Sequence, residues 1–436
     1  MTGAINIVNN TFDGVTLNNG NGVLYVRSTP TSYVFKNNLF LNENGANNML
    51  SKASGVTVPN EVSNNYFYNC TAEKFWTGLI NQDVALANGG AILLKDPVKD
   101  AAKLDYTLVN ALCISRRIGS SRWNNMGDFY LDTTVSDVES LYSAISAGIP
   151  AIQLTPGVYD LRTVVEGGIL TTTAPLQLYC EDKSAEIIGA FKLGAGTTSF
   201  EVDGLVFNGA DKALGNAFEI GEAIEIQKVM MWNCEIKGYN KSVFYGNGDG
   251  SQVNVFDFSR NQVHGFGTGQ GMLDIRKGTY AALNVSRNTF YDGGRDFIRC
   301  DAGIASSIAI ENNTFAGCSI DAGNGLLWIR SCADAPENYI VQKNLFLNLT
   351  GEKTVLAKTG ATVPTMSSNY FFNVGAAFWG GAINQETATA NGGVLDADPC
   401  NDSATFNFML KDATLRAADI GDPRWNPSSP NYKKKK

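Results

Sequence analysis

Residues 253–261 read VNVFDFSRN, and stretches of the same form follow further along the chain. They are YAALNVSRN at 280–288, SSIAIENN at 306–313 and NYIVQKN at 338–344. Each is a short alternating run rich in Val, Ile, Phe or Tyr that ends in Asn, and this alternation is typical of half-buried strands. No repeat contains a helical face of about ten residues. The sequence therefore predicts short strands that recur at a regular interval.

The asparagine that ends each stretch gives the interval. Nine such asparagines are spaced 25 to 31 residues apart within two runs: Asn10, Asn38 and Asn65, then Asn233, Asn261, Asn288, Asn313, Asn344 and Asn369. A period of this size indicates a solenoid, and several short strands per coil fit an all-β, right-handed parallel β-helix. Asn tolerates a left-handed bend, and stacked asparagines can hydrogen-bond from coil to coil. We therefore expect these asparagines to build the scaffold.

One segment departs from the strand pattern. SDVESLYSAISAG at 136–148 starts with a capping residue, has apolar residues at helical spacing and ends in Gly, which predicts a short helix near 136–147. A helix at this place would cover the open edge of the first coil. The complete β-helix is therefore expected to span 136–426.

The N-terminal part of the chain repeats the C-terminal part. Residues 5–124 match 308–426: LYVRS matches LWIRS, FWTGLINQ matches FWGGAINQ, and IGSSRWN matches IGDPRWN. We interpret 1–125 as the last three coils of a duplicated, truncated β-helix, 126–135 as a linker and 427–436 as a tail. An uncapped first coil would leave strand edges unpaired, so 1–125 is expected either to stack on an end of the second β-helix, within the chain or in a neighbour, or to be a poorly stable half-domain, which we favour. Whether it is a native part or a fragment stays open.

Composition excludes several classes of function. The net charge of −8 argues against an extended nucleic-acid surface, and no apolar run is long enough for a membrane span. The first residues have no signal-peptide pattern. The eight cysteines form no CxxC pair and the chain has one histidine, His264, so a zinc site is not expected. The cysteines are predicted to be mostly buried, with one disulfide left open.

Several stretches together resemble a known group: PGVYDL, GGRDFIRCDAG, ENNTF, KNLFLN and IGDPRWN. The sequence resembles secreted or surface β-helix proteins of Bacteroidetes polysaccharide-utilisation systems, many known only as unknown-function domains, whose fold is similar to that of pectate lyases. The resemblance implies an extracellular or cell-surface location and a polysaccharide ligand, whereas catalysis does not follow from fold alone.

The enzymes of this fold suggest two chemistries. Pectin hydrolases carry paired aspartates and a Gly-His-Gly, of which VHGFG around His264 is only a partial echo. Lyases use a Lys or Arg to remove a proton beside a uronate carboxylate, which Ca²⁺ or basic groups neutralise. Ca²⁺ is therefore a cofactor candidate, although GNGDG at 246–250 offers only one carboxylate, Asp249, where Ca²⁺ takes several oxygen ligands. No metal ligands are assigned.

A lyase site needs cations on one face, and the strands after each bend supply them. MLDIRKG, RDFIRCDAG, LLWIRSC and TVLAKTG align when their cations are superposed, which puts Arg276, Arg299, Arg330 and Lys358 at one position. With Ile275, Ile298 and Ile329 pointing inward, the cations are predicted to point outward as a column, because alternate strand residues share a face. The N-terminal copy repeats the end of this column with Tyr25, Arg27 and Lys52.

The column defines a candidate site. Arg299 and Arg276 are assigned as catalytic, and the predicted substrate-binding residues are Arg330, Lys358, Trp328, Phe297, Arg295, Asp296 and Asp301. Stacked like charges repel, and an acidic, pectin-like polysaccharide would offset this repulsion. The first hypothesis is a protein that binds such a polysaccharide, with cleavage by β-elimination as its enzymatic form. The alternative is a non-catalytic structural or adhesive solenoid, whose arginines pair with Asp274, Asp296 and Asp301.

Overall fold

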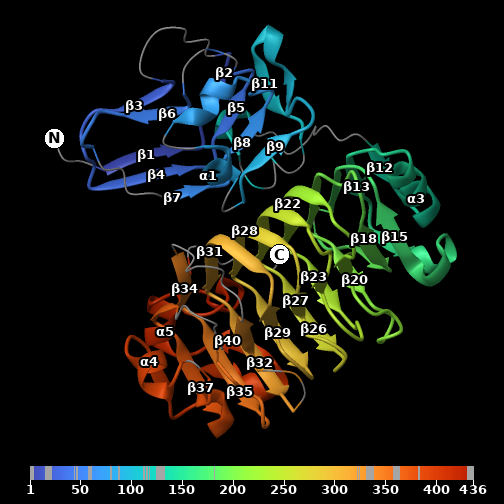
Figure 1. The fold of residues 1–436 in the computed structure, drawn as a ribbon, viewed down its shortest axis with the longest axis vertical. Coiled ribbons are helices and arrows are strands. Elements are labelled where there is room, and N and C mark those ends of the chain that lie inside the picture. The colour runs from blue at the N-terminus through green and yellow to red at the C-terminus, as the bar shows by residue number, and fades with distance from the viewer. Residues whose placement is uncertain are drawn as a thin grey trace. The chain divides into compact units, whose positions relative to one another are not determined.

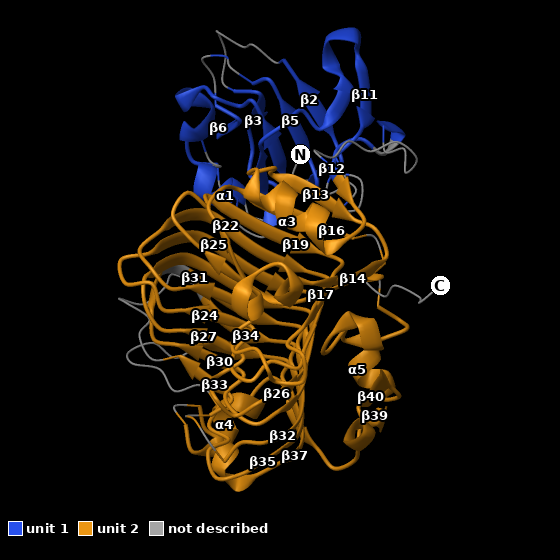
Figure 2. Cartoon of the chain, turned by 90° about the vertical axis from the view of Figure 1, so that its right-hand side faces the viewer, with its two compact units in different colours: residues 1–133 blue, residues 134–436 orange. Residues whose placement is uncertain are grey.

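The fold is described from a computed structural model. It describes residues 4–14, 22–43, 45, 48–56, 61–78, 81–86, 89–110, 113, 116, 118–123, 133–180, 182–321, 323, 325–329, 338–356, 364–381 and 383–429. The chain divides into two compact units, residues 1–133 and 134–436 (Figure 2). Two residues assigned to the site from the sequence, Arg330 and Lys358, lie outside the described residues, as do most of the predicted linker and the end of the tail.

The larger unit consists mainly of three long parallel sheets, which we call A, B and C (Figure 1). The described strands of sheet A are β12 (Thr133–Val135), β13 (Ala151–Leu154), β16 (Leu176–Tyr179), β19 (Ser199–Asp203), β22 (Glu225–Trp232), β25 (Gln252–Ser259), β28 (Thr279–Ser286), β31 (Gly303–Glu311), β34 (Asn338–Gln342) and β36 (Thr365–Ser367). Those of sheet B are β14 (Gly157–Asp160), β17 (Ala185–Ile188), β20 (Val206–Asn208), β23 (Glu235–Lys237), β26 (Gln262–Phe266), β29 (Thr289–Gly293), β32 (Thr314–Ser319), β35 (Leu345–Thr350), β37 (Tyr370–Val374) and β38 (Gly393–Leu395).

Sheet C holds the candidate site. Its described strands are β15 (Ile169–Thr172), β18 (Ala190–Leu193), β21 (Phe218–Ile220), β24 (Phe244–Gly246), β27 (Leu273–Ile275), β30 (Ile298–Cys300) and β33 (Leu327–Ile329). Along the chain the strands visit sheets A, B and C in turn, and each pairs in parallel with the strand one coil away. The unit is therefore mostly β, with long parallel sheets in an arrangement consistent with a parallel β-helix.

The asparagine ladder runs along the bend between sheets A and B. The side chain of Asn313 donates to Asn344 Oδ1 at 3.0 Å and to the carbonyl oxygen of Val285 at 2.8 Å. Its own Oδ1 accepts from both the backbone and the side-chain nitrogen of Asn288, each at 3.0 Å. Asn288, Asn313 and Asn344 are fully buried. The predicted scaffold role is confirmed, because these amides satisfy backbone groups that the bend leaves without a strand partner.

Two details of the ladder differ from the prediction. The left-handed residue is the one before the ladder position, for example Arg260 with a φ of 60° and Asn312 with a φ of 54°. Asn233 also holds this left-handed place, with a φ of 50°, and Cys234 takes the ladder position, its backbone nitrogen donating to Asn261 Oδ1. The sequence pattern does not separate the left-handed position from the ladder position that follows it, because a pair of asparagines often fills both.

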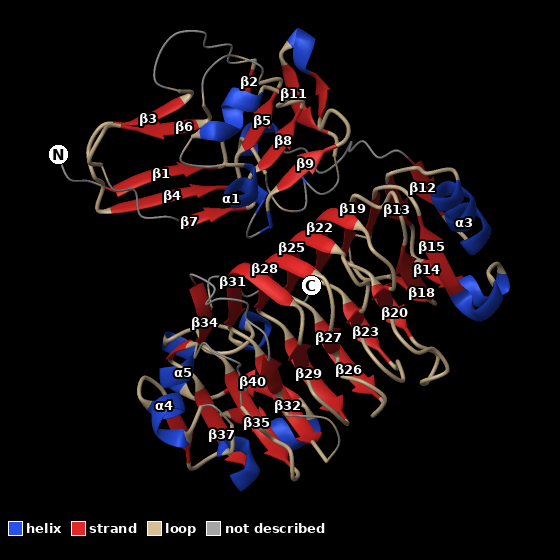
Figure 3. Cartoon of the chain, in the orientation of Figure 1, coloured by secondary structure: helices blue, strands red, loops and turns tan. Residues whose placement is uncertain are grey.

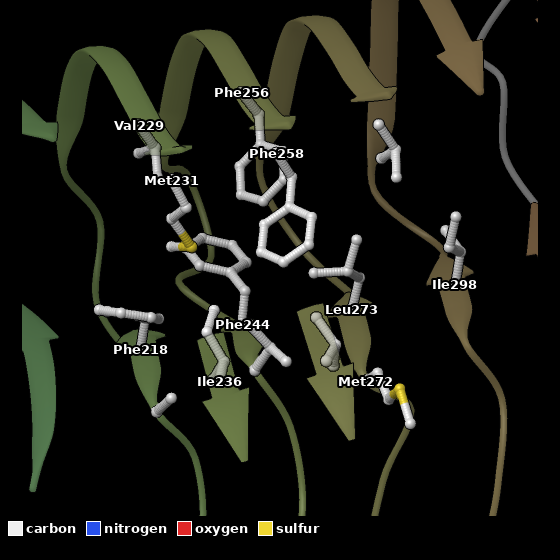
Figure 4. Close-up of a cluster of buried hydrophobic side chains, with 14 of the residues drawn as sticks. Phe218, Val229, Met231, Ile236, Phe244, Phe256, Phe258, Met272, Leu273 and Ile298 are labelled. Atoms are coloured by element: carbon white, nitrogen blue, oxygen red, sulfur yellow. The ribbon is translucent and has the colours of Figure 1, made fainter. Parts of the chain in front are cut away.

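The core lies between the three sheets. Figure 4 shows Met231 and Phe258 of sheet A, Ile236 of sheet B, and Phe244 and Leu273 of sheet C pointing toward one another. Aromatic rings on sheet B also stack from coil to coil with centroids 5.2, 5.2 and 4.9 Å apart: Phe290, Phe315, Phe346 and Phe371. Inward aliphatic and aromatic side chains of successive coils thus build a continuous apolar column.

Helices are few and short (Figure 3). α3 (Val138–Ser146) begins after Asp137, whose carboxylate accepts from the Ser140 backbone nitrogen at 2.7 Å, and Leu141 is buried in the core. The predicted capping helix is therefore present, packed on β13 and β14. The other described helical segments of this unit are η5 (Leu161–Thr163), η6 (Glu166–Gly168), η7 (Ala376–Trp379), α4 (Gln385–Thr389), η8 (Ser403–Thr405), α5 (Ala413–Ala417) and η9 (Pro423–Trp425).

The C-terminal segment packs against the outward face of the later strands of sheet B. Its antiparallel hairpin, β39 (Cys400–Asp402) and β40 (Asn407–Leu410), and helix α5 contribute to an apolar cluster with that sheet. Phe408 and Ile420 pack there with Leu345 and Leu347 of β35. This face of sheet B is thereby covered by the chain's own residues.

The smaller unit repeats this plan with fewer coils. Its described strands are β1 (Ala4–Val8), β4 (Ser32–Lys36) and β7 (Glu61–Ser63); β2 (Thr11–Asp13), β5 (Leu39–Leu41), β8 (Tyr66–Tyr68) and β9 (Ala91–Leu93); β3 (Leu24–Val26) and β6 (Leu50–Lys52); and the hairpin β10 (Val98–Asp100) with β11 (Asp105–Leu108). Its described helical segments are η1 (Glu73–Thr77), α1 (Gln82–Leu86), η3 (Ala101–Lys103) and η4 (Ser121–Trp123).

The predicted linker needs one correction. Thr133–Val135, at its end, form β12, the first strand of sheet A. Residues 126–132 lie outside the described residues. The strand was missed because TTV is too short to show an alternating pattern.

Candidate functional site on the outward face of sheet C

The outward face of sheet C carries a row of polar and aromatic side chains, which we call the sheet C row. The strand register places its members side by side on successive strands: Thr171, Lys192, Glu219, Tyr245, Asp274, Arg299 and Trp328. The residues that precede the last three, Leu273, Ile298 and Leu327, are fully buried in the core. Because alternate residues of a strand point to opposite faces, the row points outward.

An ion-pair network joins the middle of this row. Arg276 donates from Nε and Nη2 to the two carboxylate oxygens of Asp274 at 2.9 and 2.8 Å. Arg299 Nε donates to Asp301 at 2.9 Å and lies 3.8 Å from Asp274. The Arg276 guanidinium also lies 5.3 Å from the centroid of the Tyr245 ring, within cation–π range. Charges therefore alternate along Arg276, Asp274, Arg299 and Asp301, and the four residues are together neutral.

The network holds Arg276 in its charged form. Asp274 is fully buried, whereas the side chains of Arg276 and Arg299 are 29% and 15% exposed. The hydrogen bonds that Arg276 donates to Asp274 raise the pKa of Arg276 above its usual value, against the opposing effect of partial burial. Arg276 therefore stays protonated at any physiological pH and cannot accept a proton.

The predicted cation column is wrong in its register. Arg299 pairs with Asp274, and Cys300 pairs with Ile275 and with Ile329. Arg276 lies one residue beyond β27, whereas Arg299 lies in the middle of β30. The reason is that inward apolar residues set the register, and on β30 these are Ile298 and Cys300, which flank Arg299.

Phe297 is also placed differently from the prediction. Its side chain is fully buried, and its ring centroid lies 5.9 Å from that of Phe290 and 5.8 Å from that of Phe315. It belongs to the aromatic core and cannot contact a ligand. Trp328 does point outward on β33, where it is half-buried and in register with Arg299.

Arg295 and Asp296 hold turns together away from the sheet C row. Arg295 Nη1 donates to the carbonyl oxygens of Thr268 at 3.2 Å and Gly269 at 3.0 Å. Asp296 is fully buried and accepts from the backbone nitrogen of Gly325 at 2.7 Å. The two residues therefore connect the turn before β30 to the turns of neighbouring coils.

Four members of the sheet C row were missed by the sequence analysis. They are Thr171, Lys192, Glu219 and Tyr245, and Glu219 accepts from Asn216 Nδ2 at 2.9 Å. Aligning the coils on their inward apolar residues, instead of on their cations, would have found them. FYG at 244–246 then aligns with LDI at 273–275, and Tyr245 falls beside Asp274.

The donor set of the network does not fit Ca²⁺. No group of three or more His, Cys, Asp or Glu side chains suited to a metal ion occurs in the described part of the chain. Both carboxylate oxygens of Asp274 and Oδ2 of Asp301 already accept from guanidinium groups. Asp249 is 86% exposed and lies 3.6 Å from Lys277. A Ca²⁺ ion needs several oxygen ligands turned toward one point, which these residues do not provide.

A second charged group lies on the outward face of sheet B. His264 Nε2 is 3.2 Å from Glu235 Oε1, and its ring stacks on Tyr291 with centroids 4.7 Å apart. The hydrogen bond with His264, helped by Lys237, lowers the pKa of Glu235 to about 2 despite burial. The histidine therefore has an ordinary ion-pair environment and no partner that resembles a hydrolase pair.

No disulfide joins the seven described cysteines to one another, and Cys332 lies outside the described residues. Burial raises the pKa of Cys234, Cys318 and Cys400 to about 12, so these thiols stay protonated and unreactive.

Comparisons with known proteins add a little to this picture. The fold and the row define a protein with long parallel sheets and one polar, aromatic outward face. Residues 308–425 match a family described as a domain of unknown function (DUF5123). No curated protein matches the chain.

Among solved structures, the chain is similar to an arginine-to-alanine mutant of the PL6 family alginate lyase AlyGC. The identity is 12% and the TM-score is 0.33, with 85% of this chain and 58% of the lyase covered. The chain thus spans less than two thirds of that protein, and at this TM-score the similarity does not bear on the site. No helix in the described residues is long and apolar enough to cross a membrane.

Proposed function

We propose that this chain is a polysaccharide-binding protein whose ligand lies along the outward face of sheet C, between Tyr245 and Trp328. The observation that supports this is the combination on one face of two aromatic side chains with a fixed set of guanidinium and carboxylate groups. A sugar ring has an apolar face that packs on an aromatic ring, and hydroxyl groups at its edge that both donate and accept hydrogen bonds.

The spacing of these groups suits an extended ligand. Tyr245 and Trp328 lie on β24 and β33, three strand spacings apart, which is roughly 14 Å. The ion pairs between them hold Arg276 and Arg299 in place before any ligand arrives. Such preorganisation lowers the entropy cost of binding, because few side chains need to be ordered.

We propose binding without cleavage. β-Elimination needs a base that is free of its proton, and the sequence hypothesis gave this role to Arg299 and Arg276. Both guanidinium groups lie against carboxylates, and an arginine side chain does not lose its proton in proteins. Their role in the proposal is to donate hydrogen bonds to the ligand.

An acidic, pectin-like ligand has less support than the sequence suggested. The charged residues described in the row and its network are three cations and three anions: Lys192, Arg276, Arg299, Glu219, Asp274 and Asp301. This balance favours recognition through hydroxyl groups over recognition through net charge. The acidic class stays in the proposal as the second ligand class, and strong weakening by salt would identify it.

The setting and the closed form of the fold complete the proposal. We propose that the three sheets close into a right-handed solenoid, because crossovers between parallel strands are right-handed in nearly all proteins. We also propose an extracellular or cell-surface location in a polysaccharide-utilisation system of the Bacteroidetes type. This part rests on the resemblance of the sequence to β-helix proteins of such systems.

A panel of neutral and acidic polysaccharides tests the proposal. Affinity electrophoresis would compare the parent chain with Trp328→Ala and Arg276→Ala. Arg162→Ala is a matched control, because Arg162 forms the same two-bond pair with Asp160, at 2.8 and 2.7 Å, outside the row. We expect Trp328→Ala to weaken binding about tenfold, which corresponds to a lost stacking contact of about 1.4 kcal/mol, and Arg162→Ala to leave binding unchanged.

Two results would count against the proposal. Binding that is equally strong in the parent and in Trp328→Ala would remove the ligand from the sheet C row. Absence of binding across the panel would favour the structural or adhesive solenoid. Absorbance of unsaturated product, measured on the uronate polymers in the same panel, would show that cleavage occurs and that the binding-only form is wrong.

A further inference from the structure

The smaller unit presents an outward aromatic side chain at the place that corresponds to Trp328. Strand β3 pairs with β6 so that Leu24, Tyr25 and Val26 lie beside Leu50, Ser51 and Lys52. Val26 and Leu50 are buried in the core of this unit, whereas Tyr25 between Leu24 and Val26 is 37% exposed. The alternation is the one that turns Trp328 outward between Leu327 and Ile329.

The scaffold behind the two aromatic residues is the same. In the smaller unit the ring of Trp76 lies 4.9 Å from that of Phe75 at 87°, and in the larger unit Trp379 lies 5.0 Å from Phe378 at 85°. The ladder is also repeated, with Asn38 donating to Asn65 Oδ1 at 2.9 Å. These matching contacts indicate that β3, which carries Tyr25, and β33, which carries Trp328, hold equivalent positions in the two units.

Tyr25 is unusual among the aromatic residues of the chain. The largely exposed aromatic side chains in the described residues are Tyr25, Tyr142 and Phe406. The ring of Phe406 packs against Tyr291 with centroids 4.9 Å apart, and Tyr142 lies on helix α3. Tyr25 is therefore both exposed and located on a regular strand. Its position on that strand corresponds to the position of Trp328 in the sheet C row.

A cation accompanies Tyr25 on this face. Arg27 is exposed and follows Tyr25 by two residues, so both side chains leave the same face. In the matched stretches LYVRS and LWIRS, Arg27 corresponds to Arg330, which lies outside the described residues. The neighbour of Tyr25 across the sheet is the uncharged Ser51. A cation beside an aromatic ring suits a saccharide that carries a carboxylate.

We propose that the smaller unit holds a second saccharide-binding site, with Tyr25 as the stacking surface and Arg27 as the partner of a uronate carboxylate. The inference rests on the function proposed for the sheet C row and extends it to two sites in one chain. Arg27 makes this site on the smaller unit selective for acidic saccharides.

Calorimetric titration of the full chain with tetragalacturonate, and in parallel with mannotetraose, tests this inference. Tyr25→Ala and Arg27→Gln alter the smaller unit, and Trp328→Ala alters the larger one. Tyr142→Ala is the matched control, because Tyr142 is 38% exposed and lies on a helix. All four side chains lie outside the core, so circular dichroism should confirm unchanged folding.

We expect tetragalacturonate to bind at a site that Tyr25→Ala and Arg27→Gln remove and Tyr142→Ala keeps. That site should also weaken with salt, while Arg27→Gln should leave mannotetraose binding unchanged. Tetragalacturonate binding that Tyr25→Ala leaves intact and Trp328→Ala abolishes would overturn the second site and keep the function proposed for sheet C. Tetragalacturonate binding lost in Tyr25→Ala and unaffected by Trp328→Ala would support the second site. Mannotetraose binding unaffected by Trp328→Ala would count against the function proposed for sheet C. Failure of both saccharides to bind the parent chain would overturn both.

Discussion

Single charged residues in this protein behave according to the solvent and partners around them. Asp274 is removed from solvent and tolerated because two guanidinium groups surround it. Glu235 is kept ionised by His264 and Lys237. For Lys183, in the turn before β17, the surroundings disfavour the charged form. Burial and the nearby Arg424 lower its pKa to about 8, although Glu235 and Asp422 act in the opposite direction.

The depressed pKa of Lys183 predicts a pH-dependent stability. Between about pH 8 and 10.5 the unfolded chain binds a proton at this lysine that the folded chain has released, so the free energy of unfolding should rise with pH in this window. Lys183→Met should stabilise the protein at pH 7 by about 1–2 kcal/mol, and the difference should shrink as the pH approaches 10. Urea unfolding at several pH values measures this.

Lys277→Met is the control for this prediction, because Lys277 is 48% exposed. It should leave the pH profile of the parent unchanged. Parallel profiles for the parent and Lys183→Met would show that Lys183 is solvated as an ordinary surface lysine.

At the scale of the element, the ladder and the inward apolar residues have separate tasks. The ladder satisfies the backbone at each bend between sheets A and B, while the inward residues set the register of every strand. Asn313 is at the centre of the ladder, and each of its four side-chain hydrogen bonds is buried.

Asn313→Ala should be strongly destabilising. The substitution leaves the backbone nitrogen and the side chain of Asn288 without their acceptor, and the carbonyl of Val285 without its donor, in a buried bend. We expect a loss of about 3 kcal/mol in the free energy of unfolding, measured by urea titration, because unsatisfied buried polar groups cost about 1–3 kcal/mol each. Asn284→Ala, which removes one contact of 3.4 Å on the outward face, should cost under about 1 kcal/mol. Equal losses would show that the ladder does not stabilise the fold more than surface amides do.

At the scale of the whole molecule, the larger unit is a stack in which each coil contacts mainly its two neighbours. Stability in such a stack is close to a sum of coil and interface terms. A cavity in one coil should therefore weaken its neighbours more than distant coils. Ile298 on β30 suits this test, because it is fully buried between β27 and β33.

Ile298→Ala should lower the free energy of unfolding by about 3 kcal/mol. Hydrogen exchange should accelerate most at the amides of β27 and β33 and least at those of β15 and β18. Ile169→Ala is the control, since Ile169 on β15 is 50% exposed and should cost under about 0.5 kcal/mol. Uniform acceleration across all coils would show that the unit unfolds as one cooperative block.

The sequence by itself determined the repeating strands, the ladder and the capping helix. Each depends on local chemistry: alternation of apolar residues for strands, amides at a bend, and Asp137 with Ser140 at the start of α3. It also identified Trp328, Arg299 and Arg276 as outward residues near one another, because a period of about 25 residues brings equivalent positions together.

The tertiary structure alone decided which of these residues are neighbours and what state they are in. A register is fixed by every inward side chain at once, so treating Arg299 as the equivalent of Arg276 failed where Cys300 took an inward position. The same packing carried Phe297 into the core and brought Tyr245 beside Asp274. Whether a guanidinium is free or bound to a carboxylate depends on distances between separate coils, and sequence spacing does not contain those distances.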